Sequence, residues 1–172
     1  PDVKTAAPNR RDRSPNAPLP DKVDVLIVGT GPAGLCLAAQ LAQFPEIETM
    51  IVEASPGNIV KGKADGINTR TMEMFQAFGF ADKVKRETYW VNQTNFWMPD
   101  PDNPQAIKRI GRVQDVADDS SEMPHILINQ ARMHELFLEV MRNAPARLAP
   151  DYNLAFKDLT IDPDTDDHPV TV

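Results

Sequence analysis

The sequence has 172 residues, of which 41% are hydrophobic and 25% are charged, and its net charge is −7. This composition is typical of a soluble globular protein with one ordinary core, and its acidic balance argues against nucleic acid or a membrane as partner. A single cysteine, Cys36, excludes an intrachain disulfide and a cysteine-based zinc site, so no metal and a reducing, cytoplasmic setting are expected.

Residues 1–20 hold five of the sixteen prolines and few large apolar side chains. Such a segment cannot bury enough surface to offset the entropy of ordering, so a disordered tail is expected, followed by a folded domain over residues 21–172. The chain begins with Pro1 rather than Met, and residues 168–172 resemble an interrupted strand. Both features favour a piece of a longer chain.

An apolar run, Val23–Val28, stops at the first of three glycines, Gly29, Gly31 and Gly34, spaced as G-x-G-x-x-G. This pattern predicts a strand, a tight turn and the start of a helix, an arrangement that holds the pyrophosphate of a dinucleotide. Pro32 suits the first helical position because it lacks an N–H group. The helix is expected to end near Phe44 and to bury one face, made of Leu35, Leu37, Ala38, Leu41 and Ala42.

A second apolar strand is predicted over residues 49–52, and Glu53 follows it, twenty-four residues after Gly29. An acid at this distance accepts hydrogen bonds from the ribose hydroxyls of an adenosine. Ala54 and Ser55 come next, where an arginine would indicate a 2′-phosphate. The simpler alternative is an ordinary surface glutamate.

The middle of the chain begins with an irregular loop over residues 56–66, whose lysines would face either phosphate or only solvent. Asn68 and Thr69 are expected to cap a helix that ends at Gly79, with one or two further helical turns over residues 80–86. The apolar positions of the first helix recur at helical spacing: Met72, Phe75, Ala77 and Phe78.

The pattern then predicts a β-hairpin, with strands over residues 88–98 and 107–113, and a polar loop over 115–124. A short strand over residues 126–128 leads into a helix with a clear apolar stripe. The stripe consists of Met133, Leu136, Phe137, Val140 and Met141. His134 lies off this stripe and is expected to be exposed. Two last strands are predicted near residues 153–161 and 169–172.

Three groups of residues resemble the amino-terminal part of the flavin-dependent aromatic hydroxylases, in the branch of phenol 2-monooxygenase and 3-hydroxybenzoate 4-monooxygenase. They are Asp24–Gly34, then Lys63–Ile67 with Arg70–Glu73, then Asn129–Arg132. The resemblance implies an α/β fold, namely a Rossmann-like FAD-binding domain with a parallel sheet and an added β-hairpin, incomplete relative to the family. In such enzymes NADPH reduces the flavin, O2 reacts with it, and one oxygen atom passes to a phenol.

The resemblance also implies roles for individual residues. Gly29, Gly31, Pro32, Ala33 and Gly34 would face the pyrophosphate of FAD, and Glu53, with Ala54 and Ser55, would face the adenosine ribose. Lys61, Gly62, Lys63, Ala64 and Gly66 would pass close to the flavin, and Gln130 would contact the cofactor from the start of its helix. Arg70 is a further candidate, although an ion pair on the helix face explains it nearly as well.

Asp65 is the candidate catalytic residue. In the phenol-hydroxylating branch the matching aspartate lies beside the substrate hydroxyl, where a carboxylate can draw off the phenolic proton and make the ring electron-rich. The alternative is that Asp65 only shapes a glycine-containing turn.

Three functions therefore compete. The first is the FAD-binding portion of an NADPH-dependent monooxygenase acting on a phenolic small molecule and O2, for which the resemblance also allows a homodimer of the full-length form. The second is a truncated FAD-binding module without turnover. The third, an NAD-dependent dehydrogenase, fits less well, because a nicotinamide fold requires neither the Lys63–Ile67 loop nor Gln130.

Overall fold

The computed structural model describes residues 18–165 and 167–172, so most of the predicted tail lies outside the described residues. The chain divides into two compact units. Unit 1 comprises residues 1–61 and 131–172, and unit 2 comprises residues 62–130. No helix in the described part is long and apolar enough to cross a membrane.

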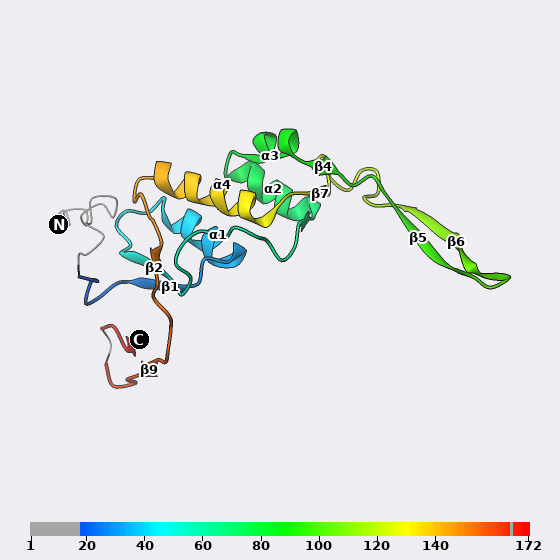
Figure 1. The fold of residues 1–172 in the computed structure, drawn as a ribbon. Coiled ribbons are helices and arrows are strands. Elements are labelled where there is room, and N and C mark those ends of the chain that lie inside the picture. The colour runs from blue at the N-terminus through cyan, green and yellow to red at the C-terminus, as the bar shows by residue number, and fades with distance from the viewer. Residues whose placement is uncertain (1–17, 166) are drawn as a thin grey trace. The chain divides into compact units, whose positions relative to one another are not determined.

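Unit 1 is built on a three-stranded sheet in the order β1-β2-β8 (Figure 1). Strands β1 (Val25–Val28) and β2 (Thr49–Glu53) are parallel, with Val25 opposite Thr49 and Val28 opposite Val52. The short strand β8 (Asp151–Tyr152) lies parallel to the end of β2, opposite Val52 and Glu53. The two predicted strands and their parallel order are thus confirmed. The third strand was not predicted, because it lies just before the range 153–161, in which only residues 160 and 161 form a strand, in a different sheet.

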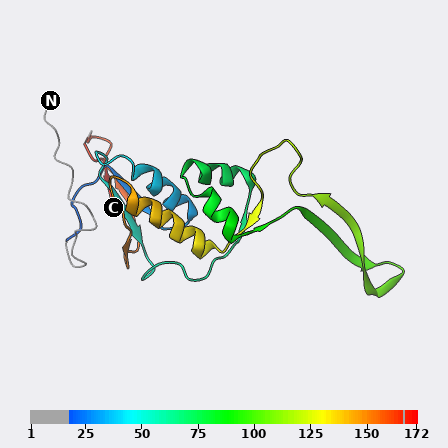
Figure 2. The ribbon, with the colours of Figure 1, turned by 90° about the horizontal axis from the view of Figure 1, so that it is seen from above.

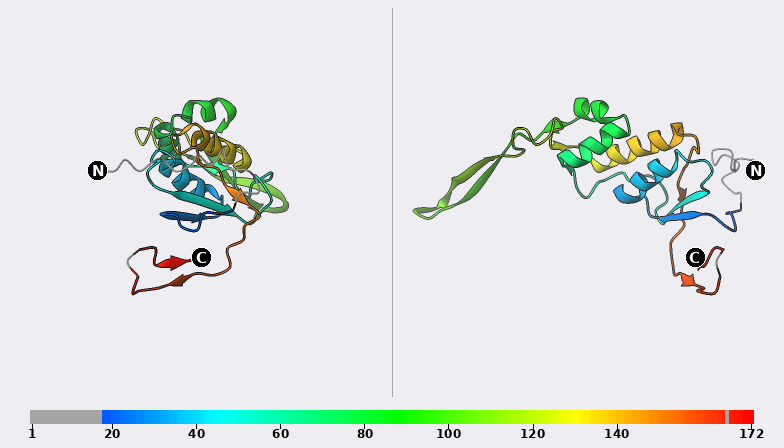
Figure 3. Two further views of the ribbon diagram at one scale, coloured as in Figure 1. Left: turned by 90° about the vertical axis from the view of Figure 1, so that its left-hand side faces the viewer. Right: turned by 180° about the vertical axis from the view of Figure 1, so that it is seen from behind.

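Two helices of unit 1 lie on the same side of this sheet (Figure 3). Helix α1 (Pro32–Leu41) begins directly after the glycine turn, and helix α4 (Gln130–Asn143), which belongs to unit 1 from Ala131 onward, runs beside it (Figure 2). The N–H of Ala146 donates to the carbonyl of Ala42 at 2.9 Å, which joins the chain after α4 to the end of α1. The buried side chains on the two helices include Leu35, Ala38, Ala39, Met133, Leu136, Phe137 and Met141.

Two predictions about burial in unit 1 are wrong. Leu37 was expected inside but is 45% exposed, because Ala39 takes the inward position on the face of α1 that meets the sheet. His134 was expected outside but is only 3% exposed. It follows Met133 directly, so the buried face of α4 is wider than its apolar stripe. Unit 1 ends in an antiparallel pair of two-residue strands, β9 (Thr160–Ile161) and β10 (Val170–Thr171).

Unit 2 contains two short helices and a small sheet in the order β3-β7-β4. Helix α2 (Thr69–Ala77) starts as predicted, with the side chain of Asn68 accepting a hydrogen bond from the N–H of Thr71 at 2.9 Å. Gly79 follows its end with a φ of +81°, a conformation that glycine adopts without strain. Helix α3 (Ala81–Glu87) comes next, and the rings of Phe75 and Phe80 lie 4.7 Å apart. The small sheet consists of β3 (Gly66–Ile67), β4 (Tyr89–Trp90) and β7 (Ile126–Leu127).

The predicted hairpin of unit 2 is present (Figure 1), with a first strand that is shorter than expected and a second strand that is longer. Strand β5 (Gln93–Asp100) pairs with β6 (Asn103–Gln114) in antiparallel register. The single strand predicted over residues 88–98 is in fact two, because β4 pairs with β7 whereas β5 pairs with β6. The hairpin carries large exposed apolar side chains, namely Phe96, Trp97, Met98, Ile107, Ile110 and Val113.

Candidate functional site

The turn between β1 and α1 has the geometry that the glycine pattern predicts. Gly29 has a φ of +97°, which a residue with a side chain rarely adopts. A Cβ on Gly31 would meet nothing within 4 Å, so the backbone there is open to a ligand. A Cβ on Gly34 would lie 2.2 Å from the carbonyl oxygen of Gly29, so only glycine lets the helix pack this closely.

Helix α1 presents its N-terminus at this turn. Pro32 occupies the start of the helix, and no side chain caps it. The first N–H groups of any α-helix lack partners within the helix, and the helix dipole favours negative charge at this end. Together with the open backbone at Gly31, this end of α1 can hold a pyrophosphate.

Glu53 ends β2 beside the same turn, and its carboxylate is held by four hydrogen bonds. Oε2 accepts from the N–H of Thr30 at 2.8 Å and from its hydroxyl at 2.9 Å. Oε1 accepts from the N–H of Ser55 at 2.9 Å and from its hydroxyl at 2.8 Å. The backbone hydrogen bond from Thr30, followed by that from Ser55, lowers the pKa of Glu53 from 4.5 to about 2. The protein itself therefore holds the Glu53 carboxylate as an anion in a fixed position.

The backbone after β2 is also fixed from the opposite side. The N–H of Asn153 donates to the carbonyl of Ser55 at 3.0 Å, and the N–H of Leu154 donates to that of Glu53 at 2.9 Å. The hydroxyl of Tyr152 donates to the side chain of Asn58. Burial, and then the negative charge of Glu53, raise the pKa of Tyr152. These contacts make the end of β2 a rigid support for the carboxylate.

Unit 2 holds the second group of predicted residues, in the loop that leads to β3. The N–H of Lys63 donates to Oε1 of Gln130 at 2.7 Å. A Cβ on Gly62 would lie 2.4 Å from Cβ of Gln130, so the loop passes closely over this residue. The side chain of Gln130 thus holds this loop in place.

Asp65 follows in the same loop and is exposed. Its carbonyl accepts a hydrogen bond from the N–H of Ile128 at 2.8 Å, which anchors the backbone but leaves the carboxylate out of the contact. Within the described part of the chain, no hydrogen bond to this carboxylate is observed, and Ala64 and Gly66 beside it are exposed as well. The side chain is available to a ligand.

Arg70 and Lys61 lack comparable support. The guanidinium of Arg70 forms an ion pair with Glu73 one turn along α2, at 2.5 Å, and is 88% exposed. The ion pair on the helix face is thus present, and the ligand contact of Arg70 stays a prediction. Lys61 and the side chain of Lys63 are exposed, as the alternative of solvated loop lysines requires.

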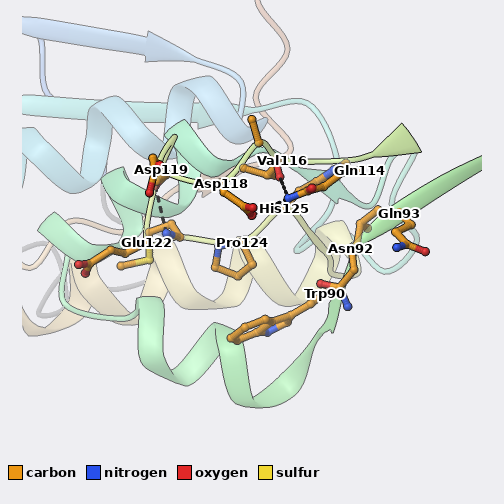
Figure 4. Close-up of a pocket in the computed structure, with 14 residues that line it drawn as sticks. Trp90, Asn92, Gln93, Gln114, Val116, Asp118, Asp119, Glu122, Pro124 and His125 are labelled. Atoms are coloured by element: carbon orange, nitrogen blue, oxygen red, sulfur yellow. Dashed lines mark hydrogen bonds between the residues drawn. The ribbon is translucent and has the colours of Figure 1, made fainter. Parts of the chain in front are cut away.

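His125 is a residue near Asp65 that the sequence analysis did not single out. Its Nδ1 lies 2.6 Å from Oδ2 of Asp115, and its Nε2 lies 3.5 Å from where a Cβ on Gly66 would be. The imidazole borders a cavity of about 550 Å³ in unit 2 (Figure 4). The cavity is also lined by the acidic side chains of Asp118, Asp119 and Glu122. No spacing in the sequence signals this histidine, because its neighbours come from distant segments. Gly66 is brought to it by the pairing of β3 with β7, and Asp115 by the backbone hydrogen bonds from Asp115 to Asn92 and from Val91 to His125.

Comparison with known proteins decides the family. The model of a family described as "FAD binding domain" matches residues 22–157. The chain belongs to the FAD-binding domain family. FAD is the cofactor by which this family is defined, and the glycine turn with Glu53 fits it.

Similar proteins include named monooxygenases. A 3-hydroxybenzoate 4-monooxygenase of Comamonas testosteroni is 56% identical over 164 residues, which cover 92% of this chain and 26% of that protein. An FAD-dependent monooxygenase, terD, of Aspergillus terreus (strain NIH 2624 / FGSC A1156) is 36% identical over 156 residues, covering 88% of this chain and 25% of that one. The chain thus spans about a quarter of the length of these relatives.

Solved structures with the same fold agree. The flavin-dependent monooxygenase PieE, in complex with FAD and substrate, superposes with a TM-score of 0.66 at 25% identity, covering 84% of this chain and 26% of PieE. p-Nitrophenol 4-monooxygenase PnpA from Pseudomonas putida DLL-E4 gives a TM-score of 0.66 at 19% identity, covering 83% and 34%, and supports the fold alone. The Rossmann-like α/β fold with its parallel sheet is therefore confirmed.

Proposed function

We propose that this chain is the FAD-binding portion of an NADPH-dependent flavoprotein monooxygenase that hydroxylates a phenolic aromatic compound. The observation that carries the proposal is the Glu53 carboxylate, ionised and held at the end of β2 beside the glycine turn. An acid in this place receives the adenosine ribose of a dinucleotide. The similarity to a 3-hydroxybenzoate 4-monooxygenase supports the reaction.

Unit 1 supplies the groups for the adenosine half of the cofactor. Its ribose hydroxyls would donate to Glu53, and its pyrophosphate would lie against Gly31 and the N-terminus of α1. Glu53 excludes a 2′-phosphate by charge, which favours FAD over NADPH at this site. Bound FAD would supply the redox chemistry, carrying electrons from NADPH to O2.

Unit 2 supplies the candidate groups for the aromatic substrate. The unpaired carboxylate of Asp65 would accept the proton of a phenol, which increases the electron density of the ring before oxygen transfer. The name of the Comamonas testosteroni relative specifies a hydroxybenzoate, which carries both a phenol and a carboxylate. His125, held through Nδ1 by Asp115, is a group of this unit that could pair with such a carboxylate.

A second candidate function is an FAD-binding module without turnover, since the groups that hold the adenosine half of the cofactor lie in unit 1 and do not involve Asp65. One experiment separates the two. The chain is purified with added FAD, its visible spectrum is recorded, and the measurement is repeated with Glu53→Ala and with Glu46→Ala, an exposed glutamate of unit 1, as the matched control.

We expect flavin to be retained by the unchanged chain and by Glu46→Ala, and to be lost from Glu53→Ala. The absence of flavin from the unchanged chain would contradict the proposal. NADPH oxidation stimulated by 3-hydroxybenzoate then distinguishes an enzyme from a module, and Asp65→Asn should abolish that stimulation while flavin stays bound. NADPH oxidation that 3-hydroxybenzoate does not stimulate would support the FAD-binding module without turnover.

A further inference from the structure

The donors that hold Glu53 are of two kinds. Each carboxylate oxygen accepts one backbone N–H and one hydroxyl, from Thr30 at Oε2 and from Ser55 at Oε1. Any residue at positions 30 and 55, proline excepted, would supply the N–H groups. Only serine or threonine would supply the hydroxyls as well, so this second pair of bonds depends on the side chains at these two positions.

The two hydroxyls differ in their surroundings. Thr30 is 7% exposed, so its hydroxyl is a buried polar group that has found its partner in Glu53. Ser55 is exposed, so water can compete for its hydroxyl. Glutamate has three side-chain torsions, and a carboxylate that is held only at its backbone end would sample several orientations. The two N–H groups and the two hydroxyls together remove that freedom, and only the hydroxyls depend on the side chains at positions 30 and 55.

We propose that the hydroxyls of Thr30 and Ser55 are positioning groups, which fix the Glu53 carboxylate in the orientation that receives the ribose hydroxyls of an adenine nucleotide. The inference rests on the proposed function, because it takes this carboxylate to be the ribose acceptor. It goes further because it assigns the preorganisation of the site to two side chains, that of Thr30 between the first two glycines and that of Ser55 two residues after Glu53. Preorganised groups bind more tightly because less freedom is lost when the ligand arrives.

The electrostatic surroundings of Glu53 make the hydroxyls more important. Two titratable groups on neighbouring elements interact with Glu53, namely His134 on α4 and Tyr152 on β8. Burial lowers the pKa of His134 and raises that of Tyr152, so both are uncharged at neutral pH. Hydrogen bonds, rather than a cation, therefore keep Glu53 ionised.

The test compares ADP with 2′-deoxy-ADP, which lacks one ribose hydroxyl. Binding of both nucleotides is measured by calorimetry for the unchanged chain, Thr30→Val, Ser55→Ala and the double variant. Thr30→Ser and Ser55→Thr keep the hydroxyls, and Thr160→Val removes an exposed hydroxyl of unit 1 elsewhere. Valine matches threonine in shape, so the first variant removes the hydrogen bond without opening a cavity.

We expect the unchanged chain to bind ADP about tenfold more tightly than 2′-deoxy-ADP, which is the effect of one hydrogen bond to a charged group. The double variant should lower this preference to about twofold, and the three hydroxyl-retaining or remote variants should keep it. If the hydroxyls had a merely structural role, their removal would weaken the binding of both nucleotides equally and leave the preference for ADP unchanged. Thr30→Val should show the larger effect of the two single variants, because its hydroxyl is buried.

A second readout needs no ligand. The titration of the Glu53 side-chain carboxyl is followed by carbon NMR in the ligand-free chain, and the pKa should rise in Thr30→Val and Ser55→Ala but not in Thr30→Ser. A double variant that binds with the full preference for ADP would overturn the inference while leaving the proposed function standing. Failure of the unchanged chain to bind either ADP or FAD would overturn the proposed function, and the ribose role of Glu53 with it.

Discussion

Two carboxylates of this chain, Glu53 in unit 1 and Asp65 in unit 2, differ in how completely the protein itself holds them. Glu53 accepts four hydrogen bonds and is ionised down to a pKa of about 2. Asp65 is exposed, and among the residues that the structure describes its backbone carbonyl has a hydrogen-bond partner but its carboxylate has none. The first is ready to receive a ligand, whereas the second must be oriented by a ligand or by other protein groups. Under the proposed function, this difference would separate cofactor binding at Glu53 from substrate chemistry at Asp65.

The glycines near the two carboxylates show the same contrast. Gly34 packs against backbone, where a Cβ would lie 2.2 Å from the oxygen of Gly29. Gly62 packs against Gln130, at 2.4 Å from its Cβ and 3.1 Å from its N. The first contact joins the turn after β1 to the first turn of α1. The second contact joins an exposed loop to Gln130 at the start of α4. An exposed loop can move away from a new methyl group at a smaller cost in stability than a turn between a strand and a helix.

Gly34→Ala should have the largest effect on stability. The new methyl group would clash with a carbonyl that the β1–α1 turn cannot move, and we expect a loss of about 3 kcal/mol in the free energy of unfolding. Denaturant unfolding measures it, with Gly57→Ala as the matched control, since a Cβ there meets nothing within 4 Å. Equal midpoints for the two variants would show that the turn is softer than its geometry indicates.

Glu53→Gln should come next, with a loss of about 2 kcal/mol at pH 7. The amide nitrogen of glutamine cannot accept, so the two donors of one residue, Thr30 or Ser55, would lose their partner. The stabilisation by ionised Glu53 is complete above 4.5, the ordinary pKa of the group, and is lost as the pH falls from there to about 2. The difference between the two chains should therefore shrink over that range. Burial lowers the pKa of His134 and the charge of Glu53 raises it, so the titration of this histidine contributes to the difference as well. A difference independent of pH would contradict the role of the charge.

Much of unit 1 could be predicted from sequence because its signals are local. The apolar run Val23–Val28, the glycine spacing and Glu53 lie within about thirty residues, and each acts on its neighbours along the chain. The cap at Asn68 and the positive φ of Gly79 are equally local. Such features follow from the chemistry of one residue and its backbone, so sequence reasoning found them.

The remaining features depend on contacts between distant segments. His134 was judged by its place on one helix, but its burial is set by what packs on α4. Its Nε2 has no hydrogen-bond partner among the described residues, an unusual cost for a buried polar atom that no periodicity predicts. The same holds for His125, whose neighbours Asp115 and Gly66 come from distant segments.

Gly62→Ala should have a moderate effect, about 1 to 2 kcal/mol, since the loop must move away from Gln130 to make room. That movement would also break the hydrogen bond from Lys63 N to Gln130 Oε1. Gly111→Ala, with its nearest contact at an ordinary 3.7 Å from Phe96, is the control within unit 2. Slower amide exchange at Lys63 in the unchanged chain than in Gly62→Ala would report the lost bond directly.

Asp65→Asn should have the smallest effect on stability, within about 0.5 kcal/mol, because an exposed carboxylate with no observed partner contributes little to folding. The same substitution would remove the proton acceptor that we propose for the phenol, so stability and substrate-stimulated NADPH oxidation should separate. Asp102→Asn, at the exposed tip of the hairpin, is the matched control and should change neither quantity. A destabilisation by Asp65→Asn as large as that by Glu53→Gln would mean that Asp65 shapes the loop. The contrast between the two carboxylates would then no longer hold, and the catalytic assignment would lose its structural support.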